Sequence, residues 1–328
     1  MSTEERLRVA RKAEFEMQSE IATMAFLRVG CAFSFLEYIH GNTAEDVSKS
    51  YPGDHEGIPP QFETKFWRQF AHIMIQLASV RMPKIGSIVY DEKNAASFTV
   101  GPFVETGTGP YASPVEFYSS YPLALHKQLG EATSGQEEAI DTVRRITSTL
   151  AAAQTDTHVG FGLVNYDLNA NNVLVDRDFN ILAVIDWDSV IAAPDAALYR
   201  FPFLMGIGPA VPGAVTSQHP AIVRRQDSAR RFAAVVEEVG HEQPPILTTR
   251  AGMKRAAFVF TKRGFFTKEA VAVRSLTYVK MKQDWVNDQW RAGLDWLDGQ
   301  DDNAVVDFIF MLHSLWYEAI ENFWYAGC

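Results

Sequence analysis

The residues best suited to chemistry lie in one short run near the middle of the chain. Four residues separate Asp167 from Asn172, and Asp186 follows further along. Phosphoryl transfer needs one carboxylate to orient the proton of the attacking hydroxyl, and it needs hard oxygen ligands to hold Mg²⁺ against the nucleotide phosphates. Asp167 suits the first role, and Asn172 and Asp186 suit the second. The spacing therefore predicts a magnesium-assisted phosphoryl-transfer site.

A β-hairpin is expected to bring these residues together. β-forming residues fill 173–175 and 181–185, and the five residues between them are typical of a tight turn. Folding back at this turn places Asp186 opposite Asn171 or Asn172. A carboxylate and a carboxamide oxygen would then lie side by side at the open end of the ribbon, just after the loop that carries the orienting carboxylate.

Helices and short strands are expected along the rest of the chain, and its second half is expected to be mostly helical. Apolar residues at a 3.6-residue period indicate helices, and runs rich in aromatic and β-branched residues indicate strands. We expect strands at 32–39, 87–90 and 96–100, and helices at 3–26, 60–78, 114–129, 135–154, 220–239, 249–293 with breaks, and 304–325. Residues 42–60 are expected as a polar loop, and the apolar segment 201–209 could wall a pocket.

The central run resembles the catalytic motif of a known enzyme family. It reads Asn-Tyr-Asp at 165–167, then Asn172, then Ile-Asp-Trp-Asp at 185–188. This pattern is similar to that of the aminoglycoside phosphotransferases and their choline-kinase and homoserine-kinase relatives, in which His-Gly-Asp-x-x-x-x-Asn is followed by Ile-Asp-Trp-Asp or Ile-Asp-Trp-Glu. The flanking segments 35–41 and 84–90 resemble those of fungal phosphotransferase enzymes of this family.

The resemblance, which covers roughly residues 19–325, implies a fold and a reaction. The implied fold is α+β and protein-kinase-like, with a truncated small N-lobe over residues 1–40 and a mostly helical large C-lobe over residues 41–328 that carries the catalytic hairpin. The implied cofactors are ATP and Mg²⁺. The implied partner is a small-molecule acceptor that offers a hydroxyl group.

The same resemblance implies a role for individual residues of the central run. Asp167 would be the catalytic base, and Asn172 and Asp186 would be the magnesium ligands. Asp188 would be an accessory acidic group. These roles agree with those that the residue types and their spacing predict independently.

On the nucleotide side, the resemblance implies a second group of residues. Glu20 would match the glutamate of the small-lobe helix that normally pairs with a phosphate-binding lysine. Backbone groups of Glu37, Tyr38 and Ile39 would face the adenine. However, only nineteen residues precede Glu20, and they contain no glycine-rich hairpin of the kind that covers the phosphates in this family.

Two departures from the family pattern keep an alternative open. Asn165 and Tyr166 replace the family's His and Gly, and we expect Asn165 to substitute for the His through hydrogen bonding, because that His mainly supports the structure. The shortened N-lobe is the larger departure. The alternative is therefore a catalytically inactive pseudokinase, or a truncated gene product, that binds a metabolite or a protein partner.

Composition narrows the class of partner and the compartment. The formal net charge of −10 and the pI near 5.3 argue against binding to nucleic acid or anionic membranes, which needs clustered Lys and Arg. Cys31 and Cys328 are the only two cysteines, so no disulfide framework is indicated. The polar N-terminus lacks the apolar core of a secretory signal. We expect a cytoplasmic protein.

Overall fold

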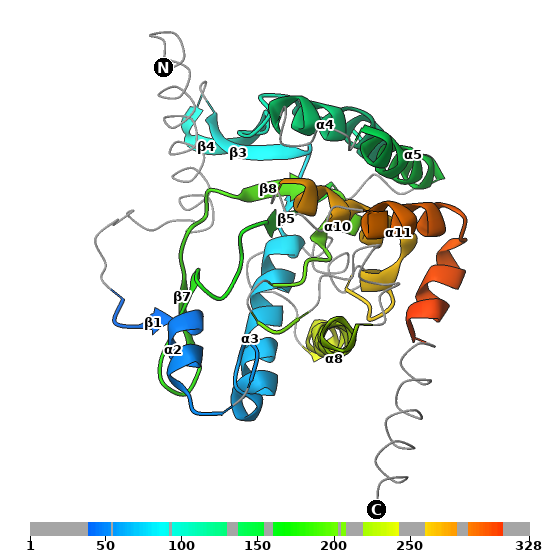
Figure 1. The fold of residues 1–328 in the computed structure, drawn as a ribbon. Helices are drawn as coiled ribbons and strands as arrows, with labels where there is room; N and C mark the ends of the chain where they lie inside the picture. Colours follow the sequence, from blue (N-terminus) through cyan, green and yellow to red (C-terminus); the bar gives the residue numbers. More distant parts are fainter. Residues whose placement is uncertain are drawn as a thin grey trace, which may run out of the picture.

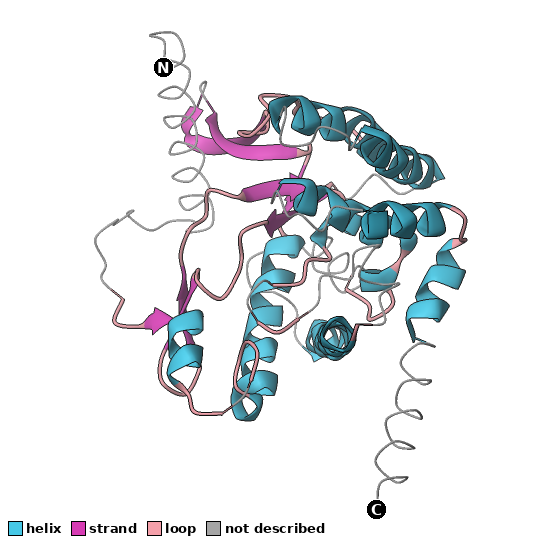
Figure 2. Cartoon of the chain, in the orientation of Figure 1, coloured by secondary structure: helices cyan, strands magenta, loops and turns pink. Residues whose placement is uncertain are grey.

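The computed structural model describes nine parts of the chain, and the statements of structure below concern these parts. They are residues 39–53, 55–91, 94–129, 137–153, 160–202, 205–207, 219–242, 260–280 and 288–310. Within them the chain is a mixture of helices and antiparallel strands (Figures 1 and 2), which confirms the α+β class. No helix in these parts is long and apolar enough to cross a membrane.

The elements follow one another along the chain in the order expected from the sequence, apart from the region before residue 60. The helices are α2 (Ala44–Ser50), α3 (Pro60–Ser79), α4 (Pro114–Leu129), α5 (Glu137–Ala153), α6 (Asp195–Leu198), α8 (Pro220–Glu242), η2 (Gly264–Phe266), α10 (Lys268–Lys280) and α11 (Asp288–Asp298). The strands are β1 (Asn42–Thr43), β2 (Arg81–Met82), β3 (Gly86–Asp91), β4 (Asn94–Gly101), β5 (Phe161–Asn165), β6 (Val173–Val175), β7 (Ile181–Val184) and β8 (Val190–Ala193). Residues 302–310 are also helical.

A five-stranded sheet in the order β2-β5-β8-β3-β4 forms the larger of the two sheets. α4 and α5 pack on each other, α10 packs on α5, and α3 packs between β5 and α8 (Figure 1). The rings of Phe70 on α3, Phe232 on α8 and Phe265 in η2 are fully buried. The Phe232 ring contacts each of the other two. α3 in turn packs on β5, and the end of β5 leads into residues 166–172, which the sequence predicts as the catalytic loop.

The smaller sheet contains the predicted hairpin. β6 and β7 pair antiparallel, with Val173 opposite Val184 and Leu174 opposite Ala183, and β1 adds a third strand beside β6. The register shifts after Leu174, so that Leu182 stands as an extra residue on β7. The prediction of a hairpin at 173–175 and 181–185 is confirmed.

The expected polar loop at 42–60 is wrong in its first part, where β1 and α2 form instead. The hydroxyl of Thr43 accepts a hydrogen bond from the Asp46 backbone N–H at 3.1 Å, which caps the first turn of α2. Ala44 and Val47 are buried against the core. The charged residues of this segment therefore lie on the outer face of a short helix. The high polarity of the segment led to the expectation of a loop, although Ala44 and Val47 are buried in the core.

Of the helix expected at 249–293 with breaks, the structure describes η2, α10 and α11, and α11 ends at Asp298; of the helix expected at 304–325, the described part is helical over residues 302–310. The other expected elements that fall in the described parts are confirmed, with ends that differ by at most three residues. These are the helices at 60–78, 114–129, 135–154 and 220–239 and the strands at 87–90 and 96–100. The helix expected at 3–26 lies outside the described residues, as does all of the strand expected at 32–39 except its last residue. The division at residue 40 between two lobes stays a prediction.

Candidate functional site

Asn165 is the last residue of β5, and its side chain ties the catalytic loop to the segment after β7. Its Oδ1 accepts a hydrogen bond from the Asp167 backbone N–H at 2.9 Å, and its Nδ2 donates to the Asp186 carbonyl oxygen at 3.0 Å. A backbone N–H can only donate, so the first bond fixes which end of the amide faces which partner. Only 3% of the Asn165 surface is exposed. The two segments that carry the predicted site residues are thus joined through one buried side chain.

The carboxylate of Asp167 is held from both sides by carboxamide groups. Asn169 Nδ2 donates to its Oδ1 at 2.9 Å, and Asn172 Nδ2 donates to its Oδ2 at 2.9 Å. Both amides also donate to the Asp167 backbone carbonyl, at 2.9 Å and 2.8 Å respectively. Asp167 itself is half-buried. The carboxylate therefore has a defined orientation and still reaches the surface.

Asn172 has one side-chain atom left for another ligand. Its Nδ2 is engaged with Asp167, and within the described parts of the chain its Oδ1 accepts no hydrogen bond. The Ile185 backbone N–H donates to the Asn172 carbonyl at 2.9 Å, which places Asp186 one position beyond the pair. Asp186 thus lies opposite Asn171 and next to Asn172, as the hairpin spacing predicts.

Asp186 adopts a backbone conformation that is uncommon for a residue with a side chain. Its φ is +62°, in the left-handed region, which costs about 1–2 kcal/mol for a residue other than glycine. The hydrogen bond from Asn165 holds its carbonyl group, and the Trp187 indole N–H donates to the Val184 carbonyl at 3.0 Å. These contacts fix the chain direction on both sides of Asp186.

The residues present suit Mg²⁺ rather than a metal held by protein alone. In the described parts of the chain, no group of three or more His, Cys, Asp or Glu side chains could hold a metal ion. Asn172 and Asp186 occupy neighbouring positions of the hairpin and would each offer one oxygen ligand. Mg²⁺ typically takes one or two protein oxygens, keeps several waters and completes its coordination with nucleotide phosphates.

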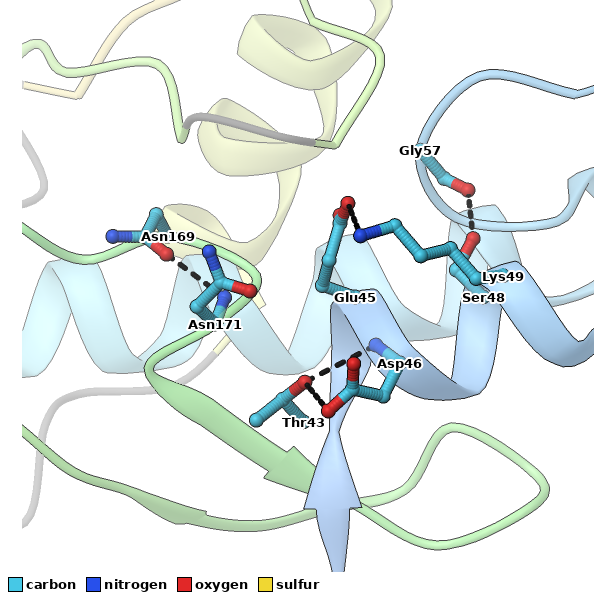
Figure 3. A network of polar contacts seen from close by, with 8 residues as sticks. All are labelled: Thr43, Glu45, Asp46, Ser48, Lys49, Gly57, Asn169 and Asn171. Carbon is cyan, nitrogen blue, oxygen red and sulfur yellow. Dashed lines mark hydrogen bonds and ion pairs between the residues drawn. The ribbon is translucent and has the colours of Figure 1, made fainter.

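The N-terminal turn of α2 supports the catalytic loop from below. The Glu45 backbone N–H donates to the Ala170 carbonyl at 3.1 Å. Figure 3 shows Asn169 and Asn171 beside this turn, together with the ion pair of 2.9 Å between Glu45 and Lys49. Because the cap of α2 is adjacent to β1, the same short segment contacts both the hairpin and the loop.

Arg200 and Tyr166 form a second support, on the side of the loop next to α6. Arg200 Nη2 donates to the Tyr166 carbonyl at 2.9 Å, and its guanidinium lies 4.2 Å from the centroid of the Tyr166 ring. Burial raises the pKa of Tyr166 to about 12, with Arg200 opposing the shift and Glu105 adding to it. The phenol is therefore neutral at physiological pH. The sequence did not predict a role for Arg200 or Glu105, because both lie outside the motif at 165–188.

A small cavity lies behind the catalytic loop. Its volume is about 20 Å³, and its lining includes Asn165, Leu168, Arg200, Phe201 and Pro202. A space of this size holds about one water molecule and is too small for a substrate. The first two residues of the apolar segment expected at 201–209, Phe201 and Pro202, do line a pocket. This pocket lies among residues that pack against the loop and is not a substrate site.

The structure brings together the predicted central residues and leaves most of the nucleotide side outside the described parts. Asn172 bonds directly to the Asp167 carboxylate, and Asn165 joins the backbone of Asp167 to that of Asp186. Glu20, Glu37 and Tyr38 lie outside the described residues. Ile39 is half-buried just before β1, and Asp188 is exposed in a turn before β8.

Asn169 is the residue of this site that the spacing argument missed. It lies two positions after Asp167, inside the four residues that the motif leaves unspecified. Asn at that position was itself a signal, because Asn side chains commonly bond to backbone two residues away.

No protein-family model, curated protein or solved structure matches this chain. What can be concluded about its function therefore depends on the geometry of these residues.

Proposed function

We propose that this chain is an ATP- and Mg²⁺-dependent phosphotransferase that acts on a hydroxyl group of a small molecule, with a protein-kinase-like fold of the aminoglycoside phosphotransferase type. The observation that carries the proposal is the connection made by Asn165. Through its two hydrogen bonds of 2.9 Å and 3.0 Å, one buried side chain holds the backbone of Asp167 on the loop and the backbone of Asp186 after the hairpin. Phosphoryl transfer depends mainly on such positioning.

Asp167 orients the acceptor hydroxyl in this proposal. Two carboxamide donors occupy one position on each carboxylate oxygen, and a carboxylate offers about four such positions. A hydroxyl group of the acceptor can therefore donate to the partly exposed carboxylate. In a loose transition state for phosphoryl transfer, orientation of the nucleophile matters more than early removal of its proton.

Asn172 and Asp186 hold the metal in this proposal. The Nδ2 of Asn172 is used for Asp167, so its Oδ1 is directed to a different partner. Bound Mg²⁺ would bridge the phosphates and neutralise the charge that develops on them. The same amide group would then link the metal to the orienting carboxylate.

An exposed apolar surface beside the metal ligands supports a nucleotide as the phosphate donor. Ile185 and Leu182 on the hairpin are 40% and 42% exposed, and large apolar side chains exposed to this extent are few in the described residues. Gly41 lies against Leu182, and a Cβ there would come 3.0 Å from the Leu182 Cδ1. Exposed apolar side chains on the hairpin suit contact with the aromatic base of a nucleotide.

The experiment that tests the proposal is thermal unfolding of the 328-residue chain with and without Mg-ATP. A ligand present at 100 times its Kd stabilises the folded state by about 2.7 kcal/mol. We expect a rise in Tm that needs magnesium and is lost in Asp186→Ala. Asp178→Ala, which removes an exposed carboxylate at the far end of the same hairpin, is expected to retain the rise.

Either outcome decides between the two readings of the sequence. A magnesium-dependent rise that Asp186→Ala abolishes justifies measuring phosphate transfer to candidate acceptors. No rise at millimolar Mg-ATP in the folded protein would refute the phosphotransferase proposal and favour an inactive relative that binds a metabolite or a protein.

A further inference from the structure

Asn169, like Asn172, donates hydrogen bonds both to the carboxylate and to the backbone carbonyl of Asp167. Its Nδ2 lies 2.9 Å from the Asp167 Oδ1 and 2.9 Å from the Asp167 carbonyl oxygen. We infer that Asn169 is a positioning residue, which holds the Asp167 carboxylate in the orientation needed for attack before any nucleotide or metal binds. This inference rests on the proposed function.

The orientation of the Asn169 amide is determined by its other end. Its Oδ1 accepts a hydrogen bond from the Asn171 backbone N–H at 2.8 Å (Figure 3). Because that partner is an obligatory donor, the oxygen must face it, and the NH₂ group must face Asp167. A charge-assisted bond to a carboxylate is stronger than a neutral one. The contact is therefore directional and fixed.

Asn169 is itself held in place by the surrounding backbone. Its carbonyl accepts a hydrogen bond from the Asn172 N–H at 3.0 Å, and the next carbonyl, that of Ala170, accepts from the Glu45 N–H at 3.1 Å. Only 8% of the Asn169 surface is exposed. A group with this support can restrict the rotation of a neighbouring carboxylate.

Asn169 and Asn172 differ in the partner of the side-chain oxygen. Asn172 is placed to bind the metal through its oxygen, so its hold on Asp167 is coupled to metal binding. Asn169 has its oxygen on backbone and is independent of the metal. If Asn169 were lost, the Oδ1 of Asp167 would lose its fixed donor, and the carboxylate could rotate away from the acceptor. The expected consequence is a lower turnover rate with unchanged nucleotide binding.

The test uses Asn169→Asp and, as a matched control, Asn171→Asp. The first variant keeps the shape and the acceptor for the Asn171 N–H but replaces the donor to Asp167 with an oxygen. The second adds the same charge to the same loop, on an exposed side chain. Asn169→Ala removes the donor without adding charge, and it serves if Asn169→Asp fails to fold. The probe is Mg-ATP alone, with water as the acceptor and ADP release as the readout.

We expect kcat for ADP release to fall about 10- to 100-fold in Asn169→Asp and Asn169→Ala, since a misplacement of about 1 Å can cost 10²-fold. The Kd for Mg-ATP, measured from the Tm shift, is expected to stay within about threefold of the wild type, and Asn171→Asp is expected to keep its kcat. Wild-type kcat in a folded Asn169 variant would overturn the inference alone. Absence of Mg-ATP binding in the wild-type protein would overturn the proposed function, and the inference with it.

Discussion

Replacement of Asn165 by leucine should separate the catalytic loop from the segment that carries Asp186. Leucine keeps the branched shape of asparagine and is larger, so the change leaves no cavity. It removes the bond from the Asp167 N–H at 2.9 Å and the bond to the Asp186 carbonyl at 3.0 Å. Both backbone groups then lose their partner in a region where the replaced side chain is only 3% exposed.

The size of the effect follows from these two lost bonds. A buried backbone group left without a partner costs about 1–3 kcal/mol, so two such groups cost about 2–6 kcal/mol. The left-handed conformation of Asp186 needs about 1–2 kcal/mol of support, which the same carbonyl contact supplies in part. For a domain of this size, 1 kcal/mol lowers Tm by roughly 2 °C. We expect Asn165→Leu to lower the free energy of unfolding by at least about 2 kcal/mol.

Urea unfolding followed by tryptophan fluorescence measures this difference as a shift in midpoint. Asn171→Leu is the matched control, because Asn171 lies on the same loop and its side chain is exposed. We expect the control to stay within about 0.5 kcal/mol of the wild type, as surface substitutions usually do. If Asn165→Leu is equally stable, the proposed link between loop and hairpin does not hold in solution.

Two further predictions concern turns of the chain. Gly57→Ala should lower the free energy of unfolding by more than about 3 kcal/mol, because a Cβ there would lie 2.1 Å from the Met205 carbonyl carbon at a φ of +74°. Gly107→Ala, at a φ of +66° with open space around it, should lower it by only about 1–2 kcal/mol, and equal losses in urea unfolding would contradict the steric argument. Asn180→Ala should be less stable than the wild type at pH 7, and the difference should shrink as the pH falls to 3 and below. The Asn180 side chain, which donates to Asp176 at 2.7 Å, is the main cause of the lowered pKa of that carboxyl, so the stabilisation is present above about pH 4 and is lost as the carboxyl protonates. The same loss at both pH values would show that the charge of Asp176 is not involved.

Helices and the hairpin were predictable from the sequence because their signals are local. Pro60 starts α3, and Phe66, Phe70 and Met74 follow at helical spacing on the buried face. In the hairpin, the turn residues between two short β-forming runs fixed the register closely enough to bring Asp186 beside Asn172. In both cases a few neighbouring residues contain the whole physical reason for the element.

The segment before α3 could not be predicted in the same way. α2 is a helix of seven residues, too short for a clear apolar period. It forms because Ala44 and Val47 find a buried surface and because its first N–H groups bond to Thr43 and to Ala170. Ala170 is distant from α2 in the sequence, so no pattern within residues 44–50 could predict this hydrogen bond.

The sequence by itself determined which residues could carry the chemistry, since Asp167, Asn172 and Asp186 have the types and the spacing that a metal-assisted transfer needs. Only the tertiary structure decided how they are held. The left-handed turn at Asp186 and the bridge from Asn165 join residues that are 21 positions apart. The conformation of a loop depends on which distant groups satisfy its buried N–H and C=O groups, and that is settled only when the whole chain has packed.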